Sequence, residues 1–192
     1  MTFALGIMTT AMPELTVKTF RDCSAPERAA FIAFVRAGGE VSMQGLVERI
    51  SSAPALVFAR IDGELVGVAA LKQPQASYRR RVSSESAVPL PAAEFPYELG
   101  WLYVSPEARR KGLSLSLSQA ALTSSAGAGV FATSRTENVA MHRSLTKLGF
   151  VPAGNAFASG RGKHSVQVFV RHAAQPVVAG DAAPKGGAAP LN

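Results

Sequence analysis

One stretch, residues 97–122 (YELGWLYVSPEARRKGLSLSLSQAAL), most constrains how this chain folds. Apolar residues typical of a buried strand run into a cationic turn that contains Gly112, and good helix formers follow. The first N–H groups of a helix lack backbone partners, and the helix dipole favours negative charge there. Because Arg109 and Lys111 flank the turn, we expect it to bind an anion, and the implied ligand carries phosphate.

The composition is that of one globular domain. The chain has 192 residues, 47% of them hydrophobic, which is enough to bury a sizeable core. Its formal net charge of +7 fits nucleic acid, anionic lipid or a polyanionic ligand as partner and does not choose among them. The single cysteine, Cys23, excludes an intrachain disulfide and favours a reducing, cytoplasmic location.

Membrane and metal partners are not expected from the sequence. No segment approaches the roughly 18 apolar residues that a membrane helix needs. His164 and His172 lack metal-ligand spacing with any Cys or carboxylate. Cys23 is interpreted as an inert, small apolar residue.

Before residue 97, the patterns predict strands, two helices and an irregular insertion. Alternation over 15–23 predicts a half-buried strand, and Ser24 is a plausible N-cap for a helix that Gly38 and Gly39 end. The apolar runs around Asp62-Gly63 predict a hairpin. A second helix is expected over 42–52, with its apolar residues in the core: Met43, Leu46, Val47 and Ile50. Residues 73–96, rich in Ser, Pro and Ala, are expected to be an irregular insertion.

After residue 97, strands and helices are expected to alternate. The segments are a strand over 98–104, a helix from the cationic turn to about 125, a strand over 130–134, a helix over 138–148, a glycine-dotted loop and a strand over 165–171. Gly149 stands where a helix C-terminus favours glycine. The ends, 1–14 and 173–192, are expected to be a loose leader and a disordered tail around a domain of residues 15–172.

This order of elements resembles the GNAT superfamily of N-acyltransferases over about residues 15–171. The specific part is the acyl-CoA loop pattern [Q/R]-x-x-G-x-[G/A], which residues 109–114 (RRKGLS) match at Arg109 and Gly112, with Ser114 in place of Gly or Ala. Downstream, Asn138 with residues 147–150 (KLGF) looks like the family's second motif. The resemblance implies a single α/β (α+β) domain with a mixed, mostly antiparallel central sheet flanked by helices.

The resemblance also implies acetyl-CoA or another acyl-CoA as co-substrate, without a metal. Gly112 would let the backbone approach the pyrophosphate, and the N–H groups of 111–114 would form a nest around it. The residues expected to bind the co-substrate are Leu102, Tyr103, Val104, Arg109, Arg110, Lys111, Gly112, Leu113, Ser114 and Asn138. The alternative for residues 109–114 is an ordinary solvated basic helix start without a ligand, and the alternative for Asn138 is an N-cap.

For catalysis, the resemblance places a strand carboxylate at Glu98, which would take the acceptor's proton through water. An equally good interpretation is a carboxylate paired with a neighbouring Arg or facing solvent. The position at which another branch of the family carries a carboxylate is Thr133. The family's usual general acid, a Tyr, is replaced by Leu145, which leaves Tyr103, His142 or solvent to protonate the thiolate.

The resulting expectation is an N-acetyltransferase that acts on a small-molecule or peptide amine, as a monomer or homodimer. Because the Leu145 side chain has no ionisable proton to give to the thiolate, a CoA-binding regulatory module with little catalysis is the alternative. A modifier of nucleic acid has only the charge to support it. The run Tyr78-Arg79-Arg80-Arg81 is interpreted as a solvated loop. The alternative is that it binds the CoA 3′-phosphate, an acidic substrate or nucleic acid.

Overall fold

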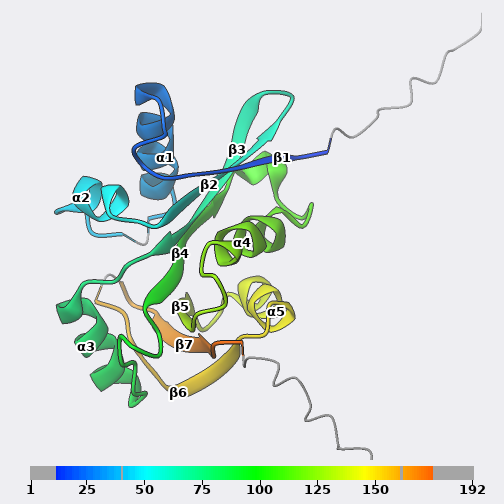
Figure 1. The fold of residues 1–192 in the computed structure, drawn as a ribbon. Coiled ribbons are helices and arrows are strands. Elements are labelled where there is room, and N and C mark those ends of the chain that lie inside the picture. The colour runs from blue at the N-terminus through cyan, green and yellow to red at the C-terminus, as the bar shows by residue number, and fades with distance from the viewer. Residues whose placement is uncertain (1–11, 40, 161, 175–192) are drawn as a thin grey trace, which may run out of the picture.

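The computed structural model describes residues 12–39, 41–160 and 162–174, so most of the expected leader and tail lies outside the described residues. Seven strands form one sheet in the order β1-β2-β3-β4-β5-β7-β6 (Figure 1). They are β1 (Glu14–Lys18), β2 (Ala55–Ile61), β3 (Glu64–Lys72), β4 (Tyr97–Val104), β5 (Val130–Arg135), β6 (Val151–Ala158) and β7 (Ser165–Arg171). Only β4 and β5 pair in parallel, which confirms the mixed, mostly antiparallel sheet.

Helices cover both faces of the sheet. They are α1 (Ala25–Ala37), α2 (Leu46–Ser51), α3 (Ala76–Ser86), α4 (Leu113–Thr123) and α5 (Val139–Lys147), with a 3₁₀ turn at Pro106–Ala108. The first three helices lie on one face, and α4 and α5 lie on the other (Figure 1). None of the helices in the described ranges combines the length and the apolar character needed to cross a membrane.

Local signals in the N-terminal half act as the sequence predicts. The Ser24 hydroxyl accepts from the Glu27 N–H, and the Glu27 carboxylate accepts from the Ser24 N–H at 2.8 Å, a complete capping box at the start of α1. Asp62 and Gly63 both have positive φ, 52° and 81°, as a type I′ turn between β2 and β3 requires. The hairpin is therefore confirmed.

The interpretation of 73–96 as irregular is wrong, because α3 runs through its first half. Val82 is fully buried in a cluster with Phe95 and Phe131, so tertiary packing stabilises a short helix whose Ser residues do not favour it. The Arg79 guanidinium is also buried and donates to three backbone carbonyls, those of Leu90, Phe95 and Pro96. Arg79 thus fastens the segment that follows α3 to the helix.

Three smaller expectations also fail. The first strand, predicted over 15–23, ends at Lys18, because a turn follows in which the Asp22 N–H donates to the Thr19 carbonyl. The segment after Phe150 is not a loop but the edge strand β6, which pairs with β7. Met43 and Val47 are 51% and 48% exposed, because the second helix is shorter than predicted and turns only Leu46 and Ile50 into the core.

The middle of β4 departs from regular geometry and opens the sheet. Trp101 has a φ of +50° at a bulge, where the β3–β4 register shifts. The bulge places Leu99 and Leu102 on the α4 face, whereas Trp101 and Tyr103 pack on the α1 face. β5 pairs with β4 only from Tyr97 to Leu99, so the two strands separate beyond that point.

Candidate active site

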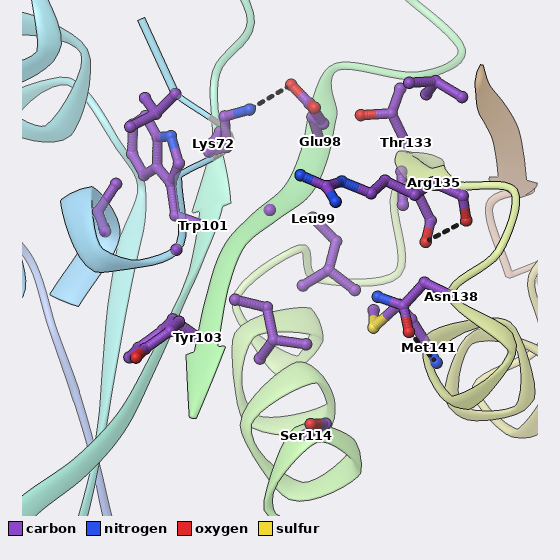
Figure 2. Close-up of a pocket in the computed structure, with 18 of the residues that line it drawn as sticks. Lys72, Glu98, Leu99, Trp101, Tyr103, Ser114, Thr133, Arg135, Asn138 and Met141 are labelled. Atoms are coloured by element: carbon purple, nitrogen blue, oxygen red, sulfur yellow. Dashed lines mark hydrogen bonds and ion pairs between the residues drawn. The ribbon is translucent and has the colours of Figure 1, made fainter. Parts of the chain in front are cut away.

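A cleft of about 1880 Å³ runs through the gap between β4 and β5. Its wall on one face of the sheet is built by the start of α4 and by α5, and its wall on the other face by α1, α2 and α3. We call these two parts the α4–α5 half and the α1–α3 half. Figure 2 shows Ser114 and Met141 on the helices of the first half, with Lys72 and Trp101 across β4 from them.

The cationic turn has the geometry of an anion site. Arg110 and Gly112 both have positive φ, 63° and 78°, and the start of α4 has no side-chain cap. A Cβ atom at Gly112 would meet nothing within 4 Å, so the space in front of the turn is open. Open first-turn N–H groups beside two arginines fit a diphosphate.

Most of the predicted co-substrate residues line the cleft. They are Leu102, Tyr103, Val104, Arg109, Arg110, Gly112, Leu113, Ser114 and Asn138. Lys111 is exposed and is not part of the lining, and the Leu113 side chain is buried in the core, which leaves its backbone to serve the turn. The Arg109 Nε donates to the Val104 carbonyl at 3.1 Å, so this arginine also fixes the turn to the end of β4.

The second motif forms the start of α5. The Asn138 Oδ1 accepts from the Met141 N–H at 3.1 Å, which makes Asn138 the N-cap, and Asn138 and Met141 both line the cleft (Figure 2). Leu145 is fully buried in the core and does not reach the cleft surface. No proton donor therefore stands at the position of the family's usual Tyr.

His142 does not face the cleft. Its Nε2 donates to the Arg135 carbonyl at 2.9 Å, and its ring lies 4.8 Å from that of Phe169, beside a separate, smaller pocket. Tyr103 does line the cleft, on the α1–α3 half, where it packs edge-on against Phe34. Of the two side chains considered as replacement acids, only Tyr103 lines the cleft.

Glu98 is buried at the point where the sheet opens. The Lys72 ammonium donates to its Oε2 at 2.6 Å, and the Tyr78 hydroxyl donates to its Oε1 at 2.9 Å (Figure 2 shows the first contact). The side chain of Glu98 is 3% exposed and that of Lys72 15%, so the pair is largely screened from bulk water. The carboxylate is paired, with a lysine rather than the arginine that the structural interpretation expected, and it also lines the cleft, as the catalytic interpretation requires.

Tyr78 connects Glu98 to β5 and to α3. Its hydroxyl lies 3.5 Å from the Thr133 Oγ1, and its ring has the Lys72 Nζ 5.5 Å and the Arg81 guanidinium 5.6 Å from its centre. Burial, together with the Glu98 carboxylate, strongly raises the pKa of Tyr78. The phenol therefore stays protonated and remains a donor to Glu98. This arrangement also shows that the run Tyr78-Arg79-Arg80-Arg81 is helical rather than a solvated loop.

Sequence reasoning missed Lys72 and the role of Tyr78. Lys72 is the direct cross-strand partner of Glu98 in the β3–β4 register. Its place at the end of the second hairpin strand was the one sequence signal that could have pointed to it. Its side chain crosses the face of Gly100, where a Cβ atom would lie 2.9 Å from the Lys72 Cδ. No sequence signal placed Tyr78 beside Glu98, because Tyr78 lies on α3, in a segment that was predicted to be irregular.

No cluster of three or more His, Cys, Asp or Glu side chains that could hold a metal is found within the described ranges. Cys23 is buried, and burial raises the pKa of its thiol, which fits an unreactive side chain.

A comparison with protein-family models identifies one family. The model of the acetyltransferase (GNAT) family matches residues 14–150. A search of curated proteins finds no match to this chain.

Three solved structures illustrate the shared fold. Escherichia coli ElaA has a TM-score of 0.61 at 14% identity, covering 83% of this chain and 99% of that one. FeeM, an N-acyl amino acid synthase from uncultured soil microbes, has a TM-score of 0.62 at 16% identity, covering 84% and 92%. An acyl-CoA N-acyltransferase from Pseudomonas aeruginosa has a TM-score of 0.56 at 17% identity, covering 83% and 99%.

The family model spans most of the chain, and these structures share its sheet and helices. The separated β4 and β5, the cationic glycine turn before α4 and the Asn-capped α5 lie inside the matched range. The chain belongs to the acetyltransferase (GNAT) family.

Proposed function

We propose that this protein is an acyl-CoA-dependent N-acyltransferase. A primary amine of the acceptor attacks the thioester directly and takes the acyl group, for which acetyl is the leading candidate. The single observation that carries the proposal is the cleft through the sheet, which joins an open anion-binding turn on one face to a buried carboxylate near the other. CoA bound with its diphosphate at Gly112 and Ser114 would direct its thioester toward the gap between β4 and β5. The acceptor would then enter from the α1–α3 half.

The chain's own groups supply three parts of the reaction. Along the residues Leu102, Tyr103 and Val104, on the part of β4 that β5 does not pair, the backbone N–H groups that point away from β3 can polarise the thioester carbonyl. Glu98 accepts the acceptor's proton through water, because its carboxylate is too buried for direct contact with a large substrate. As the C–N bond forms, the C–S bond breaks, and the leaving thiolate takes a proton from Tyr103 or from solvent.

Lys72 and Tyr78 hold Glu98 in position. Two donors fix both carboxylate oxygens, so the side chain cannot rotate away from the gap. Lys72 itself is confined by Trp101, whose ring centre lies 5.1 Å from its Nζ. We assign both residues a positioning role and reserve proton transfer for Glu98.

The test combines binding with turnover. Isothermal titration should show micromolar binding of acetyl-CoA to the folded protein. A thiol-release screen over amino acids, amines, polyamines, aminoglycosides and peptide N-termini should then find at least one acceptor. Absence of binding by acetyl-CoA and by longer acyl-CoAs would overturn the proposal.

A CoA-binding regulatory module is the second candidate, favoured by Leu145, a buried side chain without an ionisable proton at the position of the family's usual Tyr. It predicts the same titration result but no thiol release with any acceptor. Tyr103→Phe separates the routes of protonation: a slower turnover assigns the proton to Tyr103, and an unchanged turnover assigns it to solvent.

A further inference from the structure

The charge of the α1–α3 half of the cleft restricts the acceptor that it can take. Four cations and two carboxylates among the described residues line this half, a net charge of +2: Arg49, Lys72, Arg81, Arg135, Glu85 and Glu98. An acyltransferase for polyamines or aminoglycosides needs the opposite sign, since its acceptor carries several positive charges at neutral pH.

Both carboxylates in this half are already engaged. The two oxygens of Glu98 accept hydrogen bonds, one from Lys72 and one from Tyr78. The Glu85 Oε2 accepts a hydrogen bond from the Arg81 guanidinium at 2.9 Å. A polycationic acceptor would have to displace a lysine or an arginine to reach either carboxylate. The half therefore offers such an acceptor no carboxylate without a competing cation.

Arg81 is the cation best placed to meet a ligand. It is 43% exposed at the rim of the cleft, and its partner Glu85, four residues along the same helix, is 39% exposed. Exposed pairs of this kind are weak, so a ligand anion can replace Glu85 at small cost. Its guanidinium is also held over the Tyr78 ring, 5.6 Å from the ring centre, which orders the group beside the buried Tyr78–Glu98 contact.

We infer that the acceptor is a single primary amine that carries an anionic group, in the first instance a carboxylate, so that its amine lies near the gap and its anion meets Arg81. This inference rests on the proposed function and adds the substrate class. The guanidinium binds carboxylate and phosphate through the same paired N–H geometry, so an amine with a phosphate group shares the chemistry.

The test uses acceptors matched in shape. Thiol release from acetyl-CoA is measured with L-phenylalanine, L-phenylalaninamide and phenethylamine, which keep one amine and one ring and differ in the anion. Phosphoethanolamine against ethanolamine tests phosphate as the anion, and spermidine and kanamycin represent polycations. We expect kcat/KM for an anionic acceptor to exceed that of its neutral counterpart by about tenfold or more.

Two neighbouring arginines on α3 give a matched pair of variants. Arg81 lines the cleft, whereas Arg80 is exposed and lies outside the lining. Arg81→Gln should raise KM for the anionic acceptor about tenfold and leave kcat and the KM for the neutral amine unchanged. Arg80→Gln should change neither, because it removes the same charge from the same helix outside the cleft.

The possible results separate the inference from the proposed function. Turnover of spermidine, kanamycin or a neutral amine in preference to the anionic acceptors overturns the inference and leaves the acyltransferase standing. Equal KM effects of Arg81→Gln and Arg80→Gln also overturn it, because the charge would then act only at long range. Failure of acetyl-CoA to bind overturns both.

Discussion

The two halves of the cleft are built by different means. In the α4–α5 half, the ligand is expected to meet backbone: the N–H groups of one turn, a glycine with positive φ and an uncapped helix start. In the α1–α3 half, the functional groups are side chains from separate elements, with Lys72 on β3, Tyr78 on α3 and Glu98 on β4. A site made of one turn can be recognised from a hexamer, whereas a site made of distant side chains needs the fold.

The largest effect is expected at Gly112. Gly112→Asp would place a negative charge against the diphosphate, and at surface or near-surface dielectric this costs about 1 to 4 kcal/mol per charge pair, or roughly fivefold to nearly a thousandfold in the Kd for CoA. Isothermal titration with CoA measures the change.

Gly112→Asn is the matched control, since it has the same size and the same unfavourable positive φ without the charge. Its CoA affinity should fall much less. Equal losses in the Asn and Asp variants would show that steric or backbone effects, rather than charge, determine binding at this turn.

The next effect is expected in the α1–α3 half. Glu98→Gln should lower kcat by about 100-fold or more, the usual contribution of a general base, with the Kd for CoA within about twofold of wild type. Thiol-release kinetics with the best acceptor from the screen, together with CoA titration, give both quantities.

A double variant separates chemistry from charge balance, because Glu98→Gln also leaves the Lys72 ammonium without its carboxylate. Glu98→Gln with Lys72→Gln removes both charges. If the double variant stays slow, Glu98 transfers the proton. Recovery of the wild-type rate would show that the single variant failed through the unpaired lysine, and Glu98 would then be structural.

A third prediction concerns the helix that carries Tyr78. Arg79→Met should reduce the free energy of unfolding by about 2 to 3 kcal/mol, because three carbonyls after α3 lose a charged donor and parts of that segment are buried. Denaturant unfolding checks the value. Arg80→Met, at an exposed neighbour, should stay within about 0.5 kcal/mol of wild type, and equal effects of the two would refute the role of Arg79.

The smallest effect is a pH dependence at α1, which covers the α1–α3 half. Hydrogen bonds from Lys18 and from the Ser24 backbone lower the pKa of Glu27 from 4.5 to about 2. A lowered pKa stabilises the fold above the unfolded value, and this stability is lost as pH falls from about 4.5 toward 2.

Glu27→Gln should therefore show a shallower fall of Tm than wild type in that pH window, as measured by thermal unfolding at successive pH values. Parallel curves for the two proteins would mean that Glu27 does not contribute to the acid dependence.

The fold and the α4–α5 half were predictable because their signals are local. Asp62-Gly63 predicts a turn, Ser24 and Asn138 predict helix starts, and Gly112 in its basic turn predicts an anion site. These residues act on their nearest neighbours in the chain, so their patterns survive in the sequence alone.

The rest depends on contacts between distant residues. Helix α3 is stabilised by the packing of Val82 against Phe95 and Phe131, and its sequence does not indicate this contact. The bulge at Trp101 and the separation of β5 from β4 likewise arise from strand pairing. Without that pairing, Lys72 and Tyr78 could not be placed beside Glu98.

The most direct test of the two-part cleft is hydrogen exchange measured by mass spectrometry with and without CoA. The account predicts slower exchange in peptides that cover residues 110–118, where the turn and the start of α4 would donate to the diphosphate, and no change over 76–86 in α3. Protection over α3 with none over the turn would contradict the account, because CoA would then occupy the half assigned to the acceptor.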